Sequence, residues 1–190
     1  MKPSLLFLAV FCSGAAMAAS PVDNTSTLDT SGQGYKGNLS INQAAGDQQQ
    51  QNNSRAIAIG TEANATTRII QRINTPSSRA IDANSSIGGA SFSNGSGVLG
   101  INQSAGAGTQ QANAVRIGIS AAPQSIDDSV LLQQNVALSN SSDSTGQASG
   151  SRQVSTSDQA FTGSRGVVQL NQSAGVGNRM ANTLSVRVAD

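Results

Sequence analysis

The chain has 190 residues, of which 37% are hydrophobic but only 3% aromatic, and its formal net charge at pH 7 is +1. It contains no His, no Trp and a single Cys. These values disfavour an aromatic-rich globular core, imidazole or thiolate chemistry at a catalytic or metal site, and the basic, aromatic surface of a nucleic-acid-binding protein. We therefore expect no enzymatic activity, no metal or cofactor site and no nucleic-acid partner.

Residues 1–18 have the pattern of a secretory signal peptide. Lys2 gives the positive start, the apolar run extends from Leu5 to Phe11, and Ala16-Met17-Ala18 forms a small-residue cleavage site. No later run approaches the roughly 18 apolar residues that a membrane helix requires. We expect a mature chain that is exported and has no membrane span.

The predicted mature chain has neither charge excess nor thiol chemistry. Removal of Lys2 leaves ten basic residues against ten acidic ones, and removal of Cys12 leaves no cysteine. The mature chain therefore cannot form a disulfide. A net charge of zero also provides no global repulsion between copies, so association is permitted.

A repeated pattern organises the rest of the chain. After a polar stretch at 19–36, which we interpret as a flexible leader, three copies of one pattern occur without insertion or deletion. The copies occupy residues 37–60, 97–120 and 166–190, and they are joined by linker 1 (61–96) and linker 2 (121–165). Self-similarity of fixed length indicates structural units that stack on one another.

Each copy reads as a strand, a glycine-containing arc and a second strand. In the first copy Leu39, Ile41 and Gln43 alternate on one face, and beyond Gly46 the alternation resumes from Asn53 to Ile59. A spacing of two excludes a helical stripe. The sequence thus predicts an all-β fold, a β-solenoid-like stack of three strand-arc-strand repeats with long irregular linkers.

The stacking core is predicted from the positions that recur in all copies. An Asn or Gln amide both donates and accepts, so a column of amides can bond along the stack. Glycine permits a positive φ or a close layer spacing, and β-branched residues favour strands. The predicted amyloid-core residues are Asn42, Gln43, Gly46, Asn53, Ile57, Ile59, Asn102, Gln103, Gly106, Asn113, Ile117, Ile119, Asn171, Gln172, Gly175, Asn182, Val186 and Val188.

The charged residues also favour stacking of the copies. Arg55, for example, aligns with Val115 and Leu184, and no column of the aligned copies carries two charges. If copies follow in the order one, two, three through successive molecules, like charges recur only every third layer, about 14 Å apart at about 4.8 Å per layer. That distance exceeds a screening length of about 8 Å.

The linkers are less informative. In linker 1, the apolar island at 69–73 could add a short strand. In linker 2, residues 125–138 suit either a capped helix or a strand, and the tract 139–164 is low in apolar residues and is expected to be disordered or loosely draped.

The repeats resemble the Fap functional-amyloid subunits of pseudomonads, which are exported chains with three imperfect repeats separated by long linkers. The resemblance covers the signal, the three repeats and the linker arrangement, and it rests on the threefold motif G-x-[LV]-x-[IL]-N-Q-[SA]-A-G followed by N-x-x-x-[IV]-x-[IV]. It implies a subunit of extracellular amyloid fimbriae that supports biofilm formation and adhesion. It also implies self-association, co-assembly with a major subunit, and export through the periplasm with chaperones and an outer-membrane pore.

Within that family the chain looks more like the minor, nucleating subunit than the major one. The major subunit is longer and carries a C-terminal Cys-x-x-Cys, which this mature chain lacks. Three alternatives remain open: the major subunit, a monomeric β-solenoid adhesin or binding module, and disordered low-complexity sequence. Assembly distinguishes the last two from an amyloid subunit of either kind, because only an amyloid subunit forms seedable fibres with a repeat near 4.7 Å.

Overall fold

A computed structural model describes residues 22–73, 81–121 and 150–189, which form nine parallel-paired strands. None of these residues belongs to a helix that could cross a membrane. The strands are β1 (Val22–Asp29), β2 (Lys36–Ala45), β3 (Gln50–Gly60), β4 (Ile81–Gly88), β5 (Ser96–Ala107), β6 (Gln110–Ser120), β7 (Arg152–Thr156), β8 (Arg165–Val176) and β9 (Arg179–Ala189).

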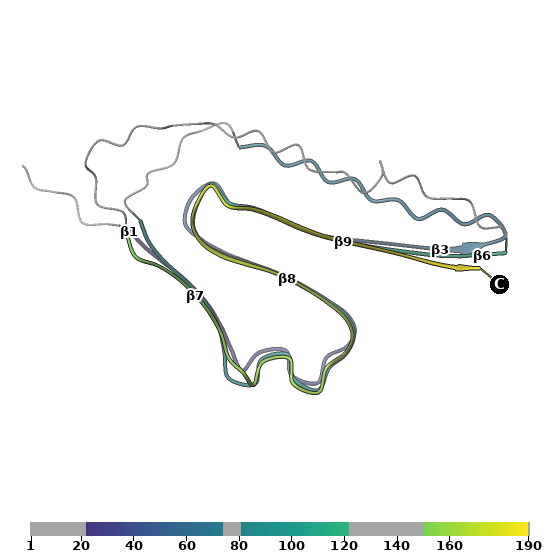
Figure 1. Cartoon of the computed structure of the whole chain (residues 1–190), viewed down its shortest axis with the longest axis horizontal. Helices are drawn as coiled ribbons and strands as arrows, with labels where there is room; N and C mark the ends of the chain where they lie inside the picture. The colour runs from purple at the N-terminus through teal and green to yellow at the C-terminus, as the bar shows by residue number, and fades with distance from the viewer. Residues whose placement is uncertain (1–21, 74–80, 122–149, 190) are drawn as a thin grey trace, which may run out of the picture.

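The strands form three sheets of three, each with one strand from every turn of the chain. Sheet A has the order β1-β4-β7, sheet B the order β2-β5-β8 and sheet C the order β3-β6-β9. Layer 1 is therefore β1 to β3, layer 2 is β4 to β6 and layer 3 is β7 to β9. Viewed along the stack, the three layers overlay as a single bent path (Figure 1). The prediction of an all-β, solenoid-like stack is confirmed.

The pairing register is the one that the ungapped alignment predicts. Asn42 pairs with Asn102 and Asn102 with Asn171. The sequence offset is 60 residues between the first pair and 69 between the second. The longer second connection therefore leaves the strand pairing unchanged.

Sheet A is the main difference from the sequence prediction. The stretch 19–36, expected to be a flexible leader, contains β1, and the two linkers contain β4 and β7. These strands are needed because sheet B is apolar on the side that faces away from sheet C, and sheet A covers that side. β7 also places structure within the tract 139–164 that was expected to be disordered or loosely draped.

The apolar island of linker 1 is not a strand. Residues 63–73 run without strand pairing along the outer face of sheet C. Arg116 Nε donates to Thr67 Oγ1 at 2.8 Å, and the Ala63 amide donates to Ser120 Oγ at 3.3 Å. The segment 125–138, with its helix or strand alternatives, lies outside the described residues.

The apolar core lies between sheets A and B. Ile87 of β4, Leu99 and Ile101 of β5, and Phe92 from the connecting loop are fully buried there. The ring of Phe92 stacks on that of Phe161 in the next layer, with centroids 5.5 Å apart. A Cβ on Gly32, in layer 1, would lie 2.6 Å from the Phe92 ring, so the glycine leaves the space that the ring fills.

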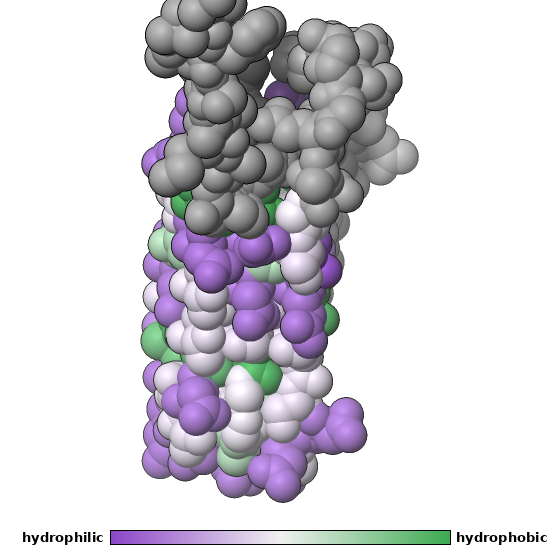
Figure 2. Space-filling view, turned by 90° about the vertical axis from the view of Figure 1, so that its left-hand side faces the viewer, coloured by the Kyte–Doolittle hydropathy of each residue, from purple (hydrophilic) through white to green (hydrophobic). Residues whose placement is uncertain are grey.

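The outer surface is mostly polar. Figure 2 shows a narrow side of the stack on which hydrophilic residues dominate and apolar residues form scattered spots. Sheet A contributes to this polarity through outward side chains such as Thr27 and Ser86, which are hydrogen-bonded to each other at 3.1 Å.

Candidate functional site: carboxamide columns and open ends

The adjacent residues Asn and Gln of each repeat point to opposite sides of sheet B, because successive side chains of a strand alternate between faces. Asn102 of β5 bonds toward sheet C, where Asn52 O accepts from its Nδ2 at 2.8 Å. Gln103 bonds toward sheet A, where Ser86 O accepts from its Nε2 at 2.8 Å. Two consecutive residues therefore connect all three sheets.

Between sheets B and C, two asparagine columns bond both along the stack and to each other. Asn113 is the centre of this network. Its Nδ2 donates to Asn53 Oδ1 in layer 1 at 3.0 Å and to Asn102 Oδ1 across the sheets at 3.1 Å. Its Oδ1 accepts from Asn182 and Asn171 in layer 3, both at 3.1 Å. The network buries its polar groups with partners, as stability requires.

The glutamine column connects sheet B to the backbone of sheet A. Gln43, Gln103 and Gln172 each donate to carbonyl oxygens of β1, β4 or β7 at 2.8 to 3.1 Å. Along the stack Gln103 also donates to Gln43 Oε1 at 3.1 Å. This column explains why sheet A can pack on sheet B although its own strands are rich in Ser, Thr and Asn.

A second glutamine pair was not predicted from the sequence. Gln111 is fully buried, and its Nε2 donates to Gln103 O at 2.9 Å and to Ser173 Oγ at 3.1 Å. Gln51, in layer 1, donates to Gln111 Oε1 at 3.0 Å. The third copy carries Met180 at this position, so a search for identical columns misses the pair. A search for residues that are polar in two of three copies would have found it.

The glycine column serves the arc for both of the predicted reasons. Gly46, Gly106 and Gly175 have φ values of +106°, +120° and +119°. A Cβ on Gly106 would lie 1.9 Å from Gly175 O, so the layers could not approach with any other residue.

The aliphatic columns of sheet C stack in register, but they are less buried than expected. Ile57 and Ile59 in layer 1 are 67% and 74% exposed, and Val188 in layer 3 is 46% exposed. The alternation placed these residues on one face correctly, but sheet B does not extend far enough to cover them (Figure 1). No other described segment packs on their face of sheet C, whereas the opposite face carries the segment 63–73.

Arg55 occupies a special place between sheets B and C in layer 1. Its Nη1 donates to Ser40 Oγ, and its Nη2 donates to Leu39 O at 3.1 Å. Burial desolvates the guanidinium and lowers the pKa of Arg55. A Cβ on Gly100, in the next layer, would lie 2.4 Å from Nη2, so glycine at that position makes room for the arginine.

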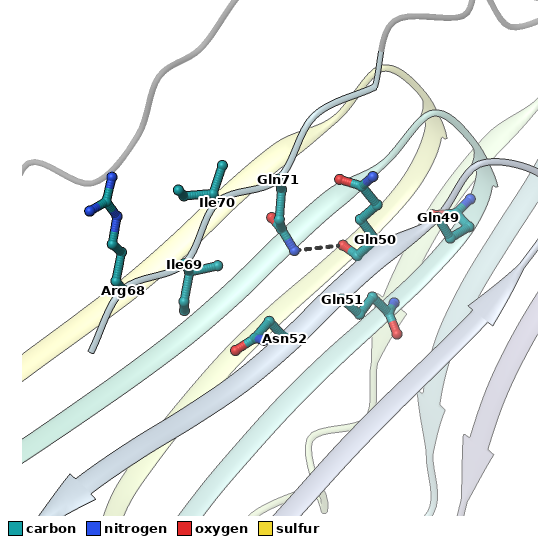
Figure 3. A pocket seen from close by; sticks show the side chains of 8 residues that line it. All are labelled: Gln49, Gln50, Gln51, Asn52, Arg68, Ile69, Ile70 and Gln71. Atoms are coloured by element: carbon teal, nitrogen blue, oxygen red, sulfur yellow. Dashed lines mark hydrogen bonds between the residues drawn. The ribbon is translucent and has the colours of Figure 1, made fainter. Parts of the chain in front are cut away.

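A shallow polar pocket lies where the segment after β3 passes the start of that strand (Figure 3). Gln71 Nε2 donates to Gln50 O at 3.1 Å, and Gln50 Nε2 donates to Arg72 O at 2.7 Å. These contacts attach the segment to the strand. The pocket shows amide and aliphatic walls and one cation, Arg68, so its chemistry does not single out a ligand.

The two ends of the stack are open sheet edges. In the part of the chain that is described, nothing pairs with the outer edges of layer 1 or of layer 3. Layer 2 has a partner on both sides, and its strands β5 and β6 are buried almost throughout. Exposed edges of this kind recruit further strands.

Comparison with known families gives a match that covers most of the chain. Residues 11–189 match the model of the functional amyloid protein FapB/FapC family. No solved structure matches the chain.

Proposed function

Because the chain belongs to the functional amyloid protein FapB/FapC family, and is thus a structural amyloid fibre subunit, we propose that it acts as the minor, FapB-like subunit that nucleates fibre growth. In this role the folded chain is a three-layer template. Chains of a major subunit would then add to its edges and continue the stack.

One observation carries the proposal: among the described residues, the three sheets end in unpaired parallel edges at both ends of the stack. A three-layer chain provides many backbone donors and acceptors in one register, so the first added chain meets a preformed surface. Nucleation is slow when the first layers must order without partners, because the ordering entropy is lost before pairing compensates for it. A preformed stack removes that step.

The remaining features of the proposal come from the family and the sequence. The fibres lie outside the cell and support biofilm formation and adhesion. The chain reaches them after signal cleavage, through the periplasm, with periplasmic chaperones and an outer-membrane pore as partners. Residues of the carboxamide and glycine columns form the amyloid core.

Seeding at a low molar ratio tests the assignment. The signal-free chain is diluted from denaturant, and dye-binding fibres with a repeat near 4.7 Å are expected. Preformed fibres, added at about one part in a hundred to the major subunit of the same system, should shorten its lag phase. The major subunit seeded with its own fibres is the matched control.

Each outcome has a definite meaning. A chain that stays monomeric at high concentration would contradict the amyloid assignment and favour a monomeric adhesin. A chain that forms fibres but seeds the major subunit no better than that subunit seeds itself would contradict the nucleating role and favour a major subunit.

A further inference from the structure

The charges of the described residues are sorted between the two outer sheets, although the whole chain has a net charge of only +1. Sheet A carries three carboxylates, Asp23, Asp29 and Asp82, and one arginine, Arg152. The strands of sheet C and the segment 63–73 that covers them contain six arginines and no acidic residue. The fold therefore gives the molecule a positive side that its composition does not reveal.

Two of these arginines, both in β9, lie on the outer face of sheet C, which is turned away from sheet B. Arg179 shares a column with Gln50, whose Nε2 donates to Arg72 O in the covering segment at 2.7 Å. Arg187 shares a column with Gly118, where a Cβ would contact the start of the same segment. Both arginine side chains are half-buried, and they lie beside the segment.

The covering segment adds two exposed arginines to this face. Arg68 and Arg72 are both exposed, and the side chain of Arg68 extends away from the strands (Figure 3). Arg116, beneath the segment, is buried, and its Nε donates to Thr67 Oγ1 at 2.8 Å. The outer face of sheet C thus has four accessible arginines, two on the segment and two in β9.

Repetition along a fibre turns this face into a row of positive charge. One copy spans three layers, which is about 14 Å at about 4.8 Å per layer, so four arginines give one charge about every 3.6 Å of fibre. Among the described residues no carboxylate pairs with any of the four. Such a row favours an extended polyanion as its ligand, because every contact made along the polymer strengthens the binding of the rest.

The shallow polar pocket beside this row adds groups that can bind hydroxyls. It lies between β3 and the covering segment, and its walls include the carboxamides of Gln50, Asn52 and Gln71 next to the guanidinium of Arg68. A carboxamide both donates and accepts hydrogen bonds, and so does the hydroxyl of a sugar. The pocket alone does not identify a ligand, but the pocket and the row together favour one that carries carboxylates and hydroxyls.

Two observations favour an acidic polysaccharide over a nucleic acid. The described residues of this face include no aromatic ring, and single-stranded nucleic acids are bound largely by stacking on such rings. Duplex DNA carries one charge per about 1.7 Å of its axis, which is about twice the density of the arginine row. A polyuronate offers one carboxylate per sugar, and a guanidinium binds a carboxylate through two parallel hydrogen bonds.

On the basis of the proposed fibre function, we propose that the outer face of sheet C is a binding site for an acidic polysaccharide that lies along the fibre. Arg68, Arg72, Arg179 and Arg187 bind its carboxylates, and the carboxamides around Gln71 bind its hydroxyls. The acidic sheet A does not attract the same ligand, so the polymer binds to one side of the fibre.

Co-sedimentation of wild-type fibres with polygalacturonate tests the ligand class. The polymer should sediment with the fibres, and its affinity should fall steeply with salt, because binding releases counterions. Fully methyl-esterified polygalacturonate has the same backbone without the charges and should stay in the supernatant. Polyglutamate, which has carboxylates but no hydroxyls, and duplex DNA should both bind more weakly than polygalacturonate.

A first variant removes half of the row without disturbing the strands. R179Q/R187A introduces the residues that the first copy has in the same columns, Gln50 and Ala58, so fibres should form as in the wild type. Loss of two exposed ion pairs per copy should weaken polygalacturonate binding about tenfold.

A second variant and a control locate the site. R68Q/R72Q removes the two arginines of the covering segment and should also weaken binding about tenfold. K36Q/R165Q removes two exposed charges from one column at the start of sheet B. It lowers the net charge by the same amount, and the affinity should change by less than about twofold.

The outcomes separate the possible failures. If the wild-type chain forms no fibres, the proposed function fails. If fibres form but both arginine variants bind polygalacturonate as well as the control does, the fibre function stands and this face is not the site. Tighter binding of DNA or polyglutamate than of polygalacturonate, or equal binding of the methyl ester, would overturn the ligand class.

Discussion

The two interfaces of sheet B differ in what repeats from layer to layer. Toward sheet A, the core position of the connecting loop is Gly32, Phe92 and Phe161 in successive layers, so each layer has its own packing. Toward sheet C, the same asparagines recur in every layer with nearly the same distances. The apolar packing between sheets A and B therefore differs from layer to layer within one molecule. The carboxamide network, in contrast, repeats in every layer and can continue into a neighbouring molecule.

The two interfaces should also differ in how well they tolerate substitutions. A hydrophobic cavity weakens contacts locally, whereas an unmatched buried polar group disturbs partners in the layers on both sides. We expect changes in the carboxamide network to stop assembly, and changes in the apolar core to weaken fibres that still form.

The largest effect is expected for Asn113→Asp. The new carboxylate would face Asn53 Oδ1, Ile101 O and Asn102 Oδ1, which are all acceptors within 3.1 Å of the present Nδ2. The loss should be about 3–5 kcal/mol, enough to abolish fibre formation at pH 7.

The pH dependence gives this prediction its sharpest check. Burial raises the pKa of the introduced carboxyl above its ordinary value of about 3.9, so the destabilisation is present above the raised pKa and disappears as the pH falls through it. Dye-binding kinetics should recover near pH 3. Gln153→Glu, on the exposed face of β7, adds the same charge as a control. Equal assembly of both variants at pH 7 would contradict the role of the network.

Phe92→Ala tests the apolar core. Removal of a fully buried ring leaves a cavity between Gly32 and Phe161 and should cost about 3–4 kcal/mol. The guanidinium midpoint of fibre dissociation should fall, while fibres still form in the same register. Phe161→Ala, at a half-buried position, should have a smaller effect. Loss of assembly in Phe92→Ala at low temperature would show that the core, too, is required for propagation.

Ile59→Thr tests the open face of sheet C. Because Ile59 is 74% exposed, the substitution should change stability by no more than about 0.5 kcal/mol. Ile101→Thr, at a fully buried position, should cost about 2–4 kcal/mol. The guanidinium midpoints of fibre dissociation, measured side by side for the two variants, show whether the burial of the side chain or its position in a strand determines the loss of stability. A large loss for Ile59→Thr in fibres would mean that assembly covers this face.

The smallest effect is expected for Asp23→Asn in sheet A. Asp23 pairs directly with Asp82, which is the like-charge neighbour that the repeats avoid. Removing one charge should stabilise the fold by about 0.2–0.5 kcal/mol, and the gain should shrink in high salt. Asp158→Asn, in an exposed loop, is the matched control, and a loss of stability specific to Asp23→Asn would be contrary to expectation.

The repeats could be predicted because their columns are equal in length and composition. Register, arc glycines and asparagine columns follow from aligning three copies. The strands of sheet A could not be found in this way: Val22 pairs with Ile81 at an offset of 59 residues, one less than the offset in sheets B and C. Their sequences also differ, because the Gln103 column bonds to their backbone and places few demands on their side chains.

Two further features depend on tertiary structure. Alternation assigns Ile57 and Ile59 to one face, but it cannot say where the neighbouring sheet ends. These aliphatic columns are exposed because sheet B ends before it reaches them. Gln111 is likewise recognised as a core residue only when Ser173 is seen to face it across the arc.

The unequal offsets of 60 and 69 residues have a consequence for how such chains change over time. Residues gained between one turn and the next do not enter the strands, so the cross-section of the fibre does not depend on what its connections carry. The connections can thus lengthen or change composition, and alter what the fibre displays to its surroundings, while chains with different connections still fit into one filament.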